Sequence, residues 1–165
     1  MTEFSSRRQL AQANWTAAFT NTAGWGALPL RLAIGFGFMA HGYAKFARGP
    51  EAFAAVLHTL GVPAPLLLAW ATTLVEIVGG AAVILGAFIP IFSIPMAIIL
   101  ITAFFTVHAP YGYFSVKFAE VTANGIKFGT VGYEIVTVYL AGLICLAING
   151  PGPLSVDAWR MRKRG

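Results

Sequence analysis

Two ionisable side chains lie four residues apart near the end of the first apolar segment, RLAIGFGFMAHGYAKF (residues 31–46). They are His41 and Lys45, and residues at this spacing share one face of an α-helix. Both side chains can donate hydrogen bonds, so they are candidates for a polar site inside a membrane. A packing hydrogen bond would also account for His41, and a lysine near a helix end can extend its ammonium to water.

A carboxylate lies near the middle of the second apolar segment, WATTLVEIVGGAAVILG, at Glu76. A charged carboxylate at the centre of a bilayer costs about 2.5–3.5 kcal/mol on insertion scales. We therefore expect Glu76 to face a helical interior, to be protonated, or to be paired. We predict that its carboxyl lies within one water-bridged contact of His41 or Lys45. A protonated, hydrogen-bonded structural carboxyl is the alternative.

The next two apolar segments each supply one further ionisable group. His108 ends the third segment and Glu134 begins the fourth. Every segment would then place a polar group in the same half of a membrane, which predicts a shared polar pocket. Phe104 and Phe105, one turn before His108, could flank a bound ring, although aromatic packing between helices would also explain them. Contact with water at the membrane surface is the alternative for His108 and Glu134.

Spacing excludes several kinds of metal and cofactor site. No Glu-x-x-His pair occurs, which argues against a di-iron carboxylate centre. Cys145 is the only cysteine, so we expect no iron–sulfur cluster and no structural zinc. His41 and His108 could ligate haem from two helices, but two isolated histidines do not specify such a site. We therefore expect no metal and no cofactor held by the chain itself.

Composition places these residues in a membrane protein. Of the 165 residues, 58% are hydrophobic and only 10% are charged, whereas a soluble domain is about a quarter charged. Four segments are long enough to cross about 30 Å of hydrocarbon. We predict an all-α, four-helix transmembrane bundle within residues 27–149, with a short interfacial helix after the first span. The expected spans are about 27–47, 64–88, 90–108 and 131–149.

Basic residues predict the orientation of this bundle. The chain has a net charge of +5, and four of its eleven basic residues lie in its last six positions. A basic segment after an apolar one is typical of a cytoplasmic anchor, and no nucleic-acid module accompanies it. We predict a polar N-terminal segment (residues 1–26) and a basic tail (residues 150–165), both cytoplasmic.

Three motifs, in this order, resemble the DoxX family of small membrane proteins. They are HG-x-x-K at residues 41–45, E-x-x-GG at residues 76–80, and GYE…NGPGPLSVDAW at residues 132–159. The family positions that match are His41, Gly42, Lys45, Glu76, Gly79, Gly80, Tyr133, Glu134, Gly150, Gly152, Ser155 and Asp157. The segment KFAEVTANGIKFG lengthens the third loop relative to the family, and GAFIPIF lacks the basic residue that the family often carries there.

The resemblance implies a membrane-bound redox role, in some members beside a quinone-reducing or thiol-oxidising partner, in the plasma (inner) membrane of a prokaryote. We expect His41, Lys45 and His108 to hold quinone carbonyls, and Glu76 and Glu134 to relay protons. Electrons would come from a soluble or membrane redox partner. A non-catalytic scaffold subunit is the alternative. Transport of a small solute fits less well, because no repeated half is present. Assembly into a homo-oligomer stays open.

Overall fold

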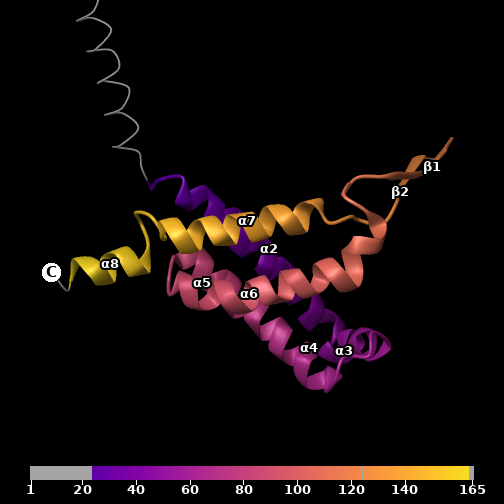
Figure 1. Cartoon of the computed structure of the whole chain (residues 1–165), viewed down its shortest axis with the longest axis horizontal. Helices are drawn as coiled ribbons and strands as arrows, with labels where there is room; N and C mark the ends of the chain where they lie inside the picture. Colours follow the sequence, from indigo (N-terminus) through magenta and orange to yellow (C-terminus); the bar gives the residue numbers. More distant parts are fainter. Residues whose placement is uncertain (1–23, 124, 164–165) are drawn as a thin grey trace, which may run out of the picture.

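The computed structural model describes residues 24–123 and 125–163, and this part of the chain is mostly helical, as predicted (Figure 1). Two helical segments, η1 and η2, are π-helical, and η3 is a 3₁₀ turn. The elements along the chain are α2 (Ala27–Arg48), α3 (Pro50–Thr59), α4 (Pro65–Leu74), η1 (Val75–Gly79), α5 (Gly80–Leu85), α6 (Ile89–Ala103), η2 (Phe104–His108), η3 (Ala109–Tyr111), β1 (Phe118–Thr122), β2 (Gly125–Phe128), α7 (Glu134–Asn149) and α8 (Val156–Arg162).

Prolines and glycines set several helix limits. Pro50 and Pro65 are the first residues of α3 and α4, positions where the missing N–H of proline has no helical partner to lose. Gly49 and Gly86 follow α2 and α5 with φ angles of 84° and 64°. That left-handed region is open to glycine at little cost.

Of the predicted polar N-terminal segment, only residues 24–26 belong to the described part of the chain. Its Arg7 and Arg8 lie outside that part.

Two helical stretches among the described residues, Pro65–Leu85 and Ile89–Tyr111, are long and apolar enough to cross a membrane. The four predicted spans are therefore only partly recovered. The first, α2, has sufficient length at 22 residues, but Arg31, His41 and Lys45 reduce its apolar character. The fourth is shorter than predicted, because the apolar helix α7 begins at Glu134 and covers 16 residues.

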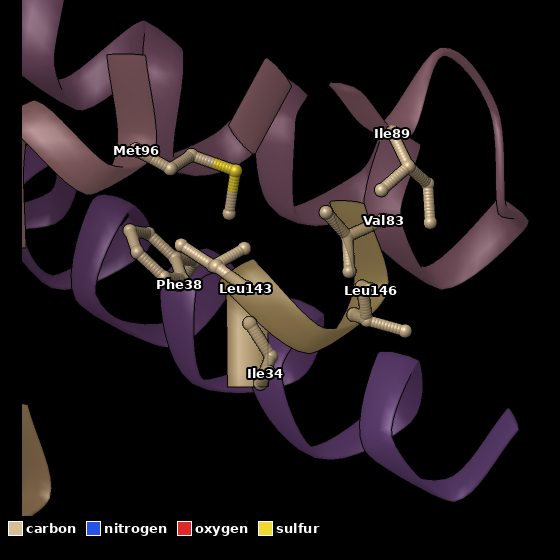
Figure 2. Close-up of a cluster of buried hydrophobic side chains, with 7 residues drawn as sticks. All are labelled: Ile34, Phe38, Val83, Ile89, Met96, Leu143 and Leu146. Carbon is tan, nitrogen blue, oxygen red and sulfur yellow. The ribbon is translucent and has the colours of Figure 1, made fainter. Parts of the chain in front are cut away.

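A buried apolar cluster joins α2, α5, α6 and α7 (Figure 2). It consists of Ile34, Phe38, Val83, Ile89, Met96, Leu143 and Leu146. Apolar side chains are also exposed on α4, α6 and α7: Leu67, Ile94 and Ile148 are 69%, 65% and 77% exposed. Such exposed apolar side chains suit contact with lipid.

The third loop contains a β-hairpin that the all-α prediction missed. Strands β1 and β2 pair antiparallel and extend away from the helices (Figure 1). A register shift between Phe118 and Glu120 interrupts the pairing. The Lys127 ammonium lies 2.8 Å from the Glu120 carboxylate, and the rings of Phe118 and Phe128 lie 5.9 Å apart. The hairpin is thus held by cross-strand contacts of its own.

Arg31 fastens the start of α2 to the loop that follows α7. Its side chain is 1% exposed, and its Nη1 and Nη2 donate to the carbonyls of Pro151 and Leu154 at 2.8 and 3.0 Å. In the same loop, Ser155 caps α8 by accepting a hydrogen bond from the amide of Ala158. The structure therefore buries this cation as a link between the two segments.

Two glycines allow α2 and α5 to touch backbone to backbone. A Cβ built on Gly35 would lie 2.5 Å from the Gly80 carbonyl oxygen, and one on Gly80 would lie 2.6 Å from the Gly35 carbonyl oxygen. No real Cβ tolerates such distances, so any side chain at either position must push the helices apart. Close approach at small residues is the usual way in which helices associate in lipid.

We predict that Gly35→Ala lowers stability by roughly 1–3 kcal/mol, because the added methyl overpacks this contact. The matched control is Gly26→Ala, since a Cβ at Gly26 meets no atom within 4 Å. Thermal unfolding in detergent, followed by circular dichroism, measures both. Equal Tm values for the two variants would contradict the predicted backbone contact.

Candidate functional site

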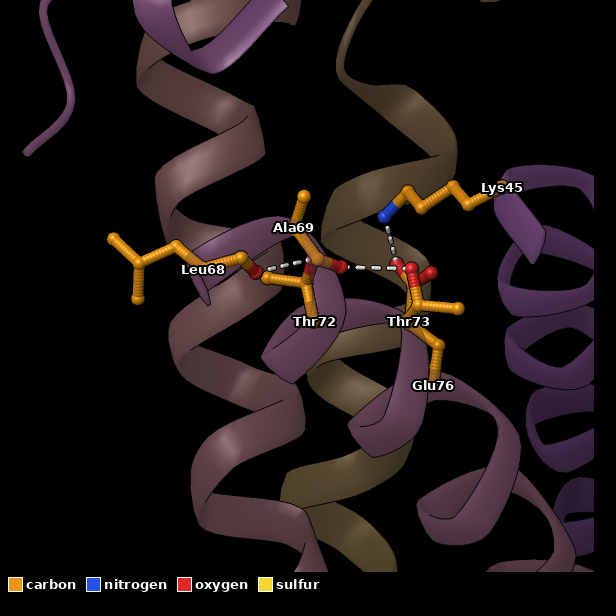
Figure 3. Close-up of polar contacts among 6 residues, drawn as sticks. All are labelled: Lys45, Leu68, Ala69, Thr72, Thr73 and Glu76. Carbon is orange, nitrogen blue, oxygen red and sulfur yellow. Dashed lines mark hydrogen bonds and ion pairs between the residues drawn. The ribbon is translucent and has the colours of Figure 1, made fainter. Parts of the chain in front are cut away.

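A buried ion pair links α2 to η1. The Lys45 Nζ lies 2.6 Å from Glu76 Oε1, and the two side chains are 20% and 6% exposed (Figure 3). The sequence predicted that His41 or Lys45 would lie within one water-bridged contact of the Glu76 carboxyl. In the structure Lys45 contacts it directly. The Lys45 ammonium also lies 4.3 Å from the centre of the Phe53 ring on α3, a cation–π distance. Lys45 thereby holds three helical segments together.

The local backbone brings the two charges together. Glu76 lies in the π-helical segment η1, within an otherwise α-helical stretch, and single π-helical turns are frequent at functional sites. Across from it, Gly42 leaves room for close approach: a Cβ on Gly42 would lie 3.0 Å from the Cβ of Glu76. The HG-x-x-K motif therefore combines a glycine at the helix contact with the lysine, one turn further on, that reaches the carboxylate.

The second carboxylate oxygen has no hydrogen-bond donor among the described residues. Glu76 Oε2 is buried and unpartnered. The nearby hydroxyls do not serve it, because Thr72 donates to the carbonyls of Leu68 and Ala69, and Thr73 donates to that of Ala69 (Figure 3). A carboxylate has about four lone-pair sites, so Glu76 keeps acceptor capacity beyond its contact with Lys45.

The ion pair lies at the wall of a cavity of about 780 Å³. Its lining comes from α2, α3, α4, η1, α6, η2 and α7 and is mostly apolar. Four of the predicted site residues line it, namely His41, Lys45, Glu76 and His108. A smaller cavity of about 280 Å³, between α2 and α3, shares His41 and Lys45 with it and adds Arg48. These four residues come from three of the four predicted helical stretches.

The two histidines differ in their surroundings. His41 is exposed and has no hydrogen-bond partner among the described residues. His108 is half-buried at the end of the π-helical segment η2, and its Nδ1 lies 2.9 Å from the carbonyl oxygen of Val131. Because a carbonyl only accepts hydrogen bonds, Nδ1 carries the proton. The contact fixes the His108 ring to the loop that leads into α7.

Three predicted site residues lie elsewhere. Glu134 begins α7, and its Oε2 accepts a hydrogen bond of 3.0 Å from the amide of Ser115, so it holds the third loop in place. Phe104 packs at 4.8 Å against the ring of Tyr133 and at 5.0 Å against Phe105. Phe105 is 69% exposed. None of the three lines either cavity, so aromatic packing and loop anchoring explain them.

Sequence reasoning missed Phe53 and Tyr139, which also line the large cavity. Phe53 was read only as part of an amphipathic surface helix, and Tyr139 lay within an uninterrupted apolar run. The described residues hold no cluster of three or more side chains of the His, Cys, Asp and Glu types that could bind a metal ion.

One known protein family matches part of the chain. The model of the DoxX family matches residues 26–109, a range that includes His41, Lys45, Glu76 and His108. The GYE…DAW motif and the hairpin lie outside the matched range. Searches among curated proteins and among solved structures found no match.

We predict that Lys45→Met destabilises the protein by about 3–5 kcal/mol, because it leaves a buried carboxylate without its cation. The double variant Lys45→Met/Glu76→Gln should recover most of that loss, since it removes both charges. Denaturant unfolding in mild detergent measures the free energies of unfolding.

The hairpin offers a matched control for this pair. Lys127 and Glu120 form an ion pair of similar length with side chains 74% and 53% exposed, so Lys127→Met should cost less than about 1 kcal/mol. If Lys45→Met lowers the free energy of unfolding by no more than Lys127→Met does, the Lys45–Glu76 pair stabilises the fold no more than an exposed ion pair.

Proposed function

The chain belongs to the DoxX family, and from that premise we propose that it is a quinone-binding component of a membrane oxidoreductase system. The observation that carries the proposal is the cavity beside Lys45 and Glu76. Its volume of about 780 Å³ lies within the range of about 300–1,000 Å³ that is usual for small-molecule sites. Such sites combine an apolar lining with a few polar groups, as this one does.

The opening of the cavity suits a ligand that enters from lipid. Ile98, Val107 and Ile135 all line it and are 58%, 43% and 51% exposed. The apolar tail of a ligand can lie against these side chains without meeting a charge. The ring head would meet the Lys45–Glu76 pair.

We assign different roles to the two partners of the ion pair. The Lys45 ammonium has three N–H donors and gives one to Glu76, so it can also donate to a ligand oxygen. Glu76 is the group that exchanges a proton with the ligand. The electrons come from a redox partner, either soluble or in the membrane.

The membrane arrangement belongs to the same proposal. We propose that α2 and α7 cross the bilayer together with Pro65–Leu85 and Ile89–Tyr111. The start of α2 and the end of α7 lie at one end of the molecule, where Arg31 binds Pro151 and Leu154 (Figure 1). An even number of crossings keeps both termini on one side. The basic tail assigns that side to the cytoplasm of a prokaryotic inner membrane.

A scaffold role is the second candidate, and the hairpin favours it. Its residues Phe118, Val121, Ile126 and Phe128 are between 52% and 71% exposed, and an open two-stranded sheet is a template for pairing with another chain. A scaffold needs no ligand in the cavity, so the two functions are separable by quinone binding.

We expect Glu76→Gln to fold normally and to bind a short-chain benzoquinone at least about tenfold more weakly or with lost turnover, because the ionised partner of Lys45 is gone. Titration of the purified protein in lipid nanodiscs measures the affinity. An organic extract and absorption spectrum of the same preparation test whether quinone is already bound.

The control is Glu51→Gln, which changes an exposed carboxylate on α3 that lines neither cavity. Quinone affinity in Glu76→Gln equal to that in Glu51→Gln, together with unchanged turnover in a reconstituted system, would leave the scaffold role as the better account.

A further inference from the structure

We propose that the cavity selects the reduced, hydroxyl-bearing form of its ligand, a hydroquinone, over the oxidised quinone, and that His108 makes the selection. This inference rests on the proposed function, because it presupposes that a quinone-type ring occupies the cavity. It reverses the role that the sequence predicted for His108, which was donation to a quinone carbonyl.

The hydrogen-bond partner of His108 determines which of its ring nitrogens can accept a hydrogen bond from the ligand. Nδ1 lies 2.9 Å from the carbonyl oxygen of Val131, and a carbonyl oxygen can only accept. In a neutral imidazole, one ring nitrogen donates and the other accepts. Because Nδ1 uses the single proton, Nε2 presents a lone pair. Nε2 is also the ring nitrogen left for a ligand, since His108 lines the cavity.

A lone pair distinguishes the two oxidation states of the ligand. A hydroquinone hydroxyl donates a hydrogen bond to Nε2, whereas a quinone carbonyl faces it with lone pairs of its own and is repelled. The Lys45–Glu76 pair is more permissive at its part of the wall, because it offers an ammonium donor and spare carboxylate acceptors. That pair accommodates a hydroxyl, which both donates and accepts, and it also accommodates a carbonyl.

The balance of donors and acceptors therefore favours the hydroquinone. One hydrogen bond contributes about 0.5–1.5 kcal/mol net, so we expect the hydroquinone to bind about three- to tenfold more tightly. Tighter binding of the reduced form makes the bound couple easier to reduce than the free couple. For a two-electron couple, a tenfold preference raises the midpoint potential by about 30 mV.

The experiment compares a decyl-benzoquinone with its hydroquinone by calorimetric titration in lipid nanodiscs without oxygen. A decyl-phenol and the corresponding methyl ether form a second pair that cannot undergo redox reactions. The phenol can donate and the ether cannot. Both pairs should show the same preference for the hydroxyl compound.

The diagnostic variant is His108→Asn. The asparagine amide nitrogen occupies the place of Nδ1, so it keeps the hydrogen bond to Val131 while the Nε2 acceptor disappears. In this variant we expect the ratio of hydroquinone affinity to quinone affinity to fall to about one. The control is His58→Asn, on α3 and outside both cavities, which should keep the preference of the unmodified protein.

Two results would overturn the inference while leaving the proposed function intact. One is a quinone affinity equal to or above that of the hydroquinone in the unmodified protein. The other is a preference that survives in His108→Asn, since His108 would then act only by holding the loop. If neither form of the ligand binds, the proposed function fails and the inference fails with it.

Discussion

The contact between Lys45 and Glu76 is the constraint around which the described part of the molecule is organised. A carboxylate in the middle of an apolar helical stretch is costly unless a cation reaches it. The end of α2 supplies that cation, and the Lys45 ammonium lies 2.6 Å away. That requirement fixes how α2 crosses η1, and the crossing in turn requires glycine at Gly42, where a Cβ would meet Glu76. The large cavity lies beside this crossing.

The same contact explains why the site is polar on one wall and apolar on the others. Glu76 and Lys45 satisfy each other's charge, so the remaining lining needs no further ions and consists mostly of apolar side chains. His108 enters the wall from η2, where the loop before α7 fixes its ring. A ligand therefore meets two separate polar positions with different hydrogen-bonding character, one on η1 and one on η2.

Much of the candidate site follows from sequence, because burying a charge leaves few options. The mid-segment position of Glu76 demanded a partner, and the spacing of His41 and Lys45 put both on the face of α2 that lines the cavity. Local contacts explain the predicted site residues that do not line the cavity. Phe104 found Tyr133 as its ring partner, and Glu134 found the amide of Ser115. Neither partner is visible in the spacing of the residues along the chain.

The parts of the fold that sequence reasoning missed have identifiable causes. The Asn-Gly pair in TANGIKFG is a strong hairpin signal, but it was read as a loop because the surrounding helices dominate the composition. The partners of Arg31 cannot be read from the sequence, because they are carbonyls exposed by the turn after α7. The π-helical turns cannot be read from the pattern of apolar residues in the sequence.

Those wide turns carry a consequence for how homologous chains can differ in length. A π-helical turn accommodates one residue more than an α-helical turn of the same height. Removing a single residue from Val75–Gly79 or from Phe104–His108 would leave a continuous helix in each case. The residues downstream would keep nearly the same orientation, because the wide turn already holds the extra residue. Natural sequences that lack one of these residues should thus keep the helix that follows in place, which makes gap placement in an alignment a structural observation in its own right.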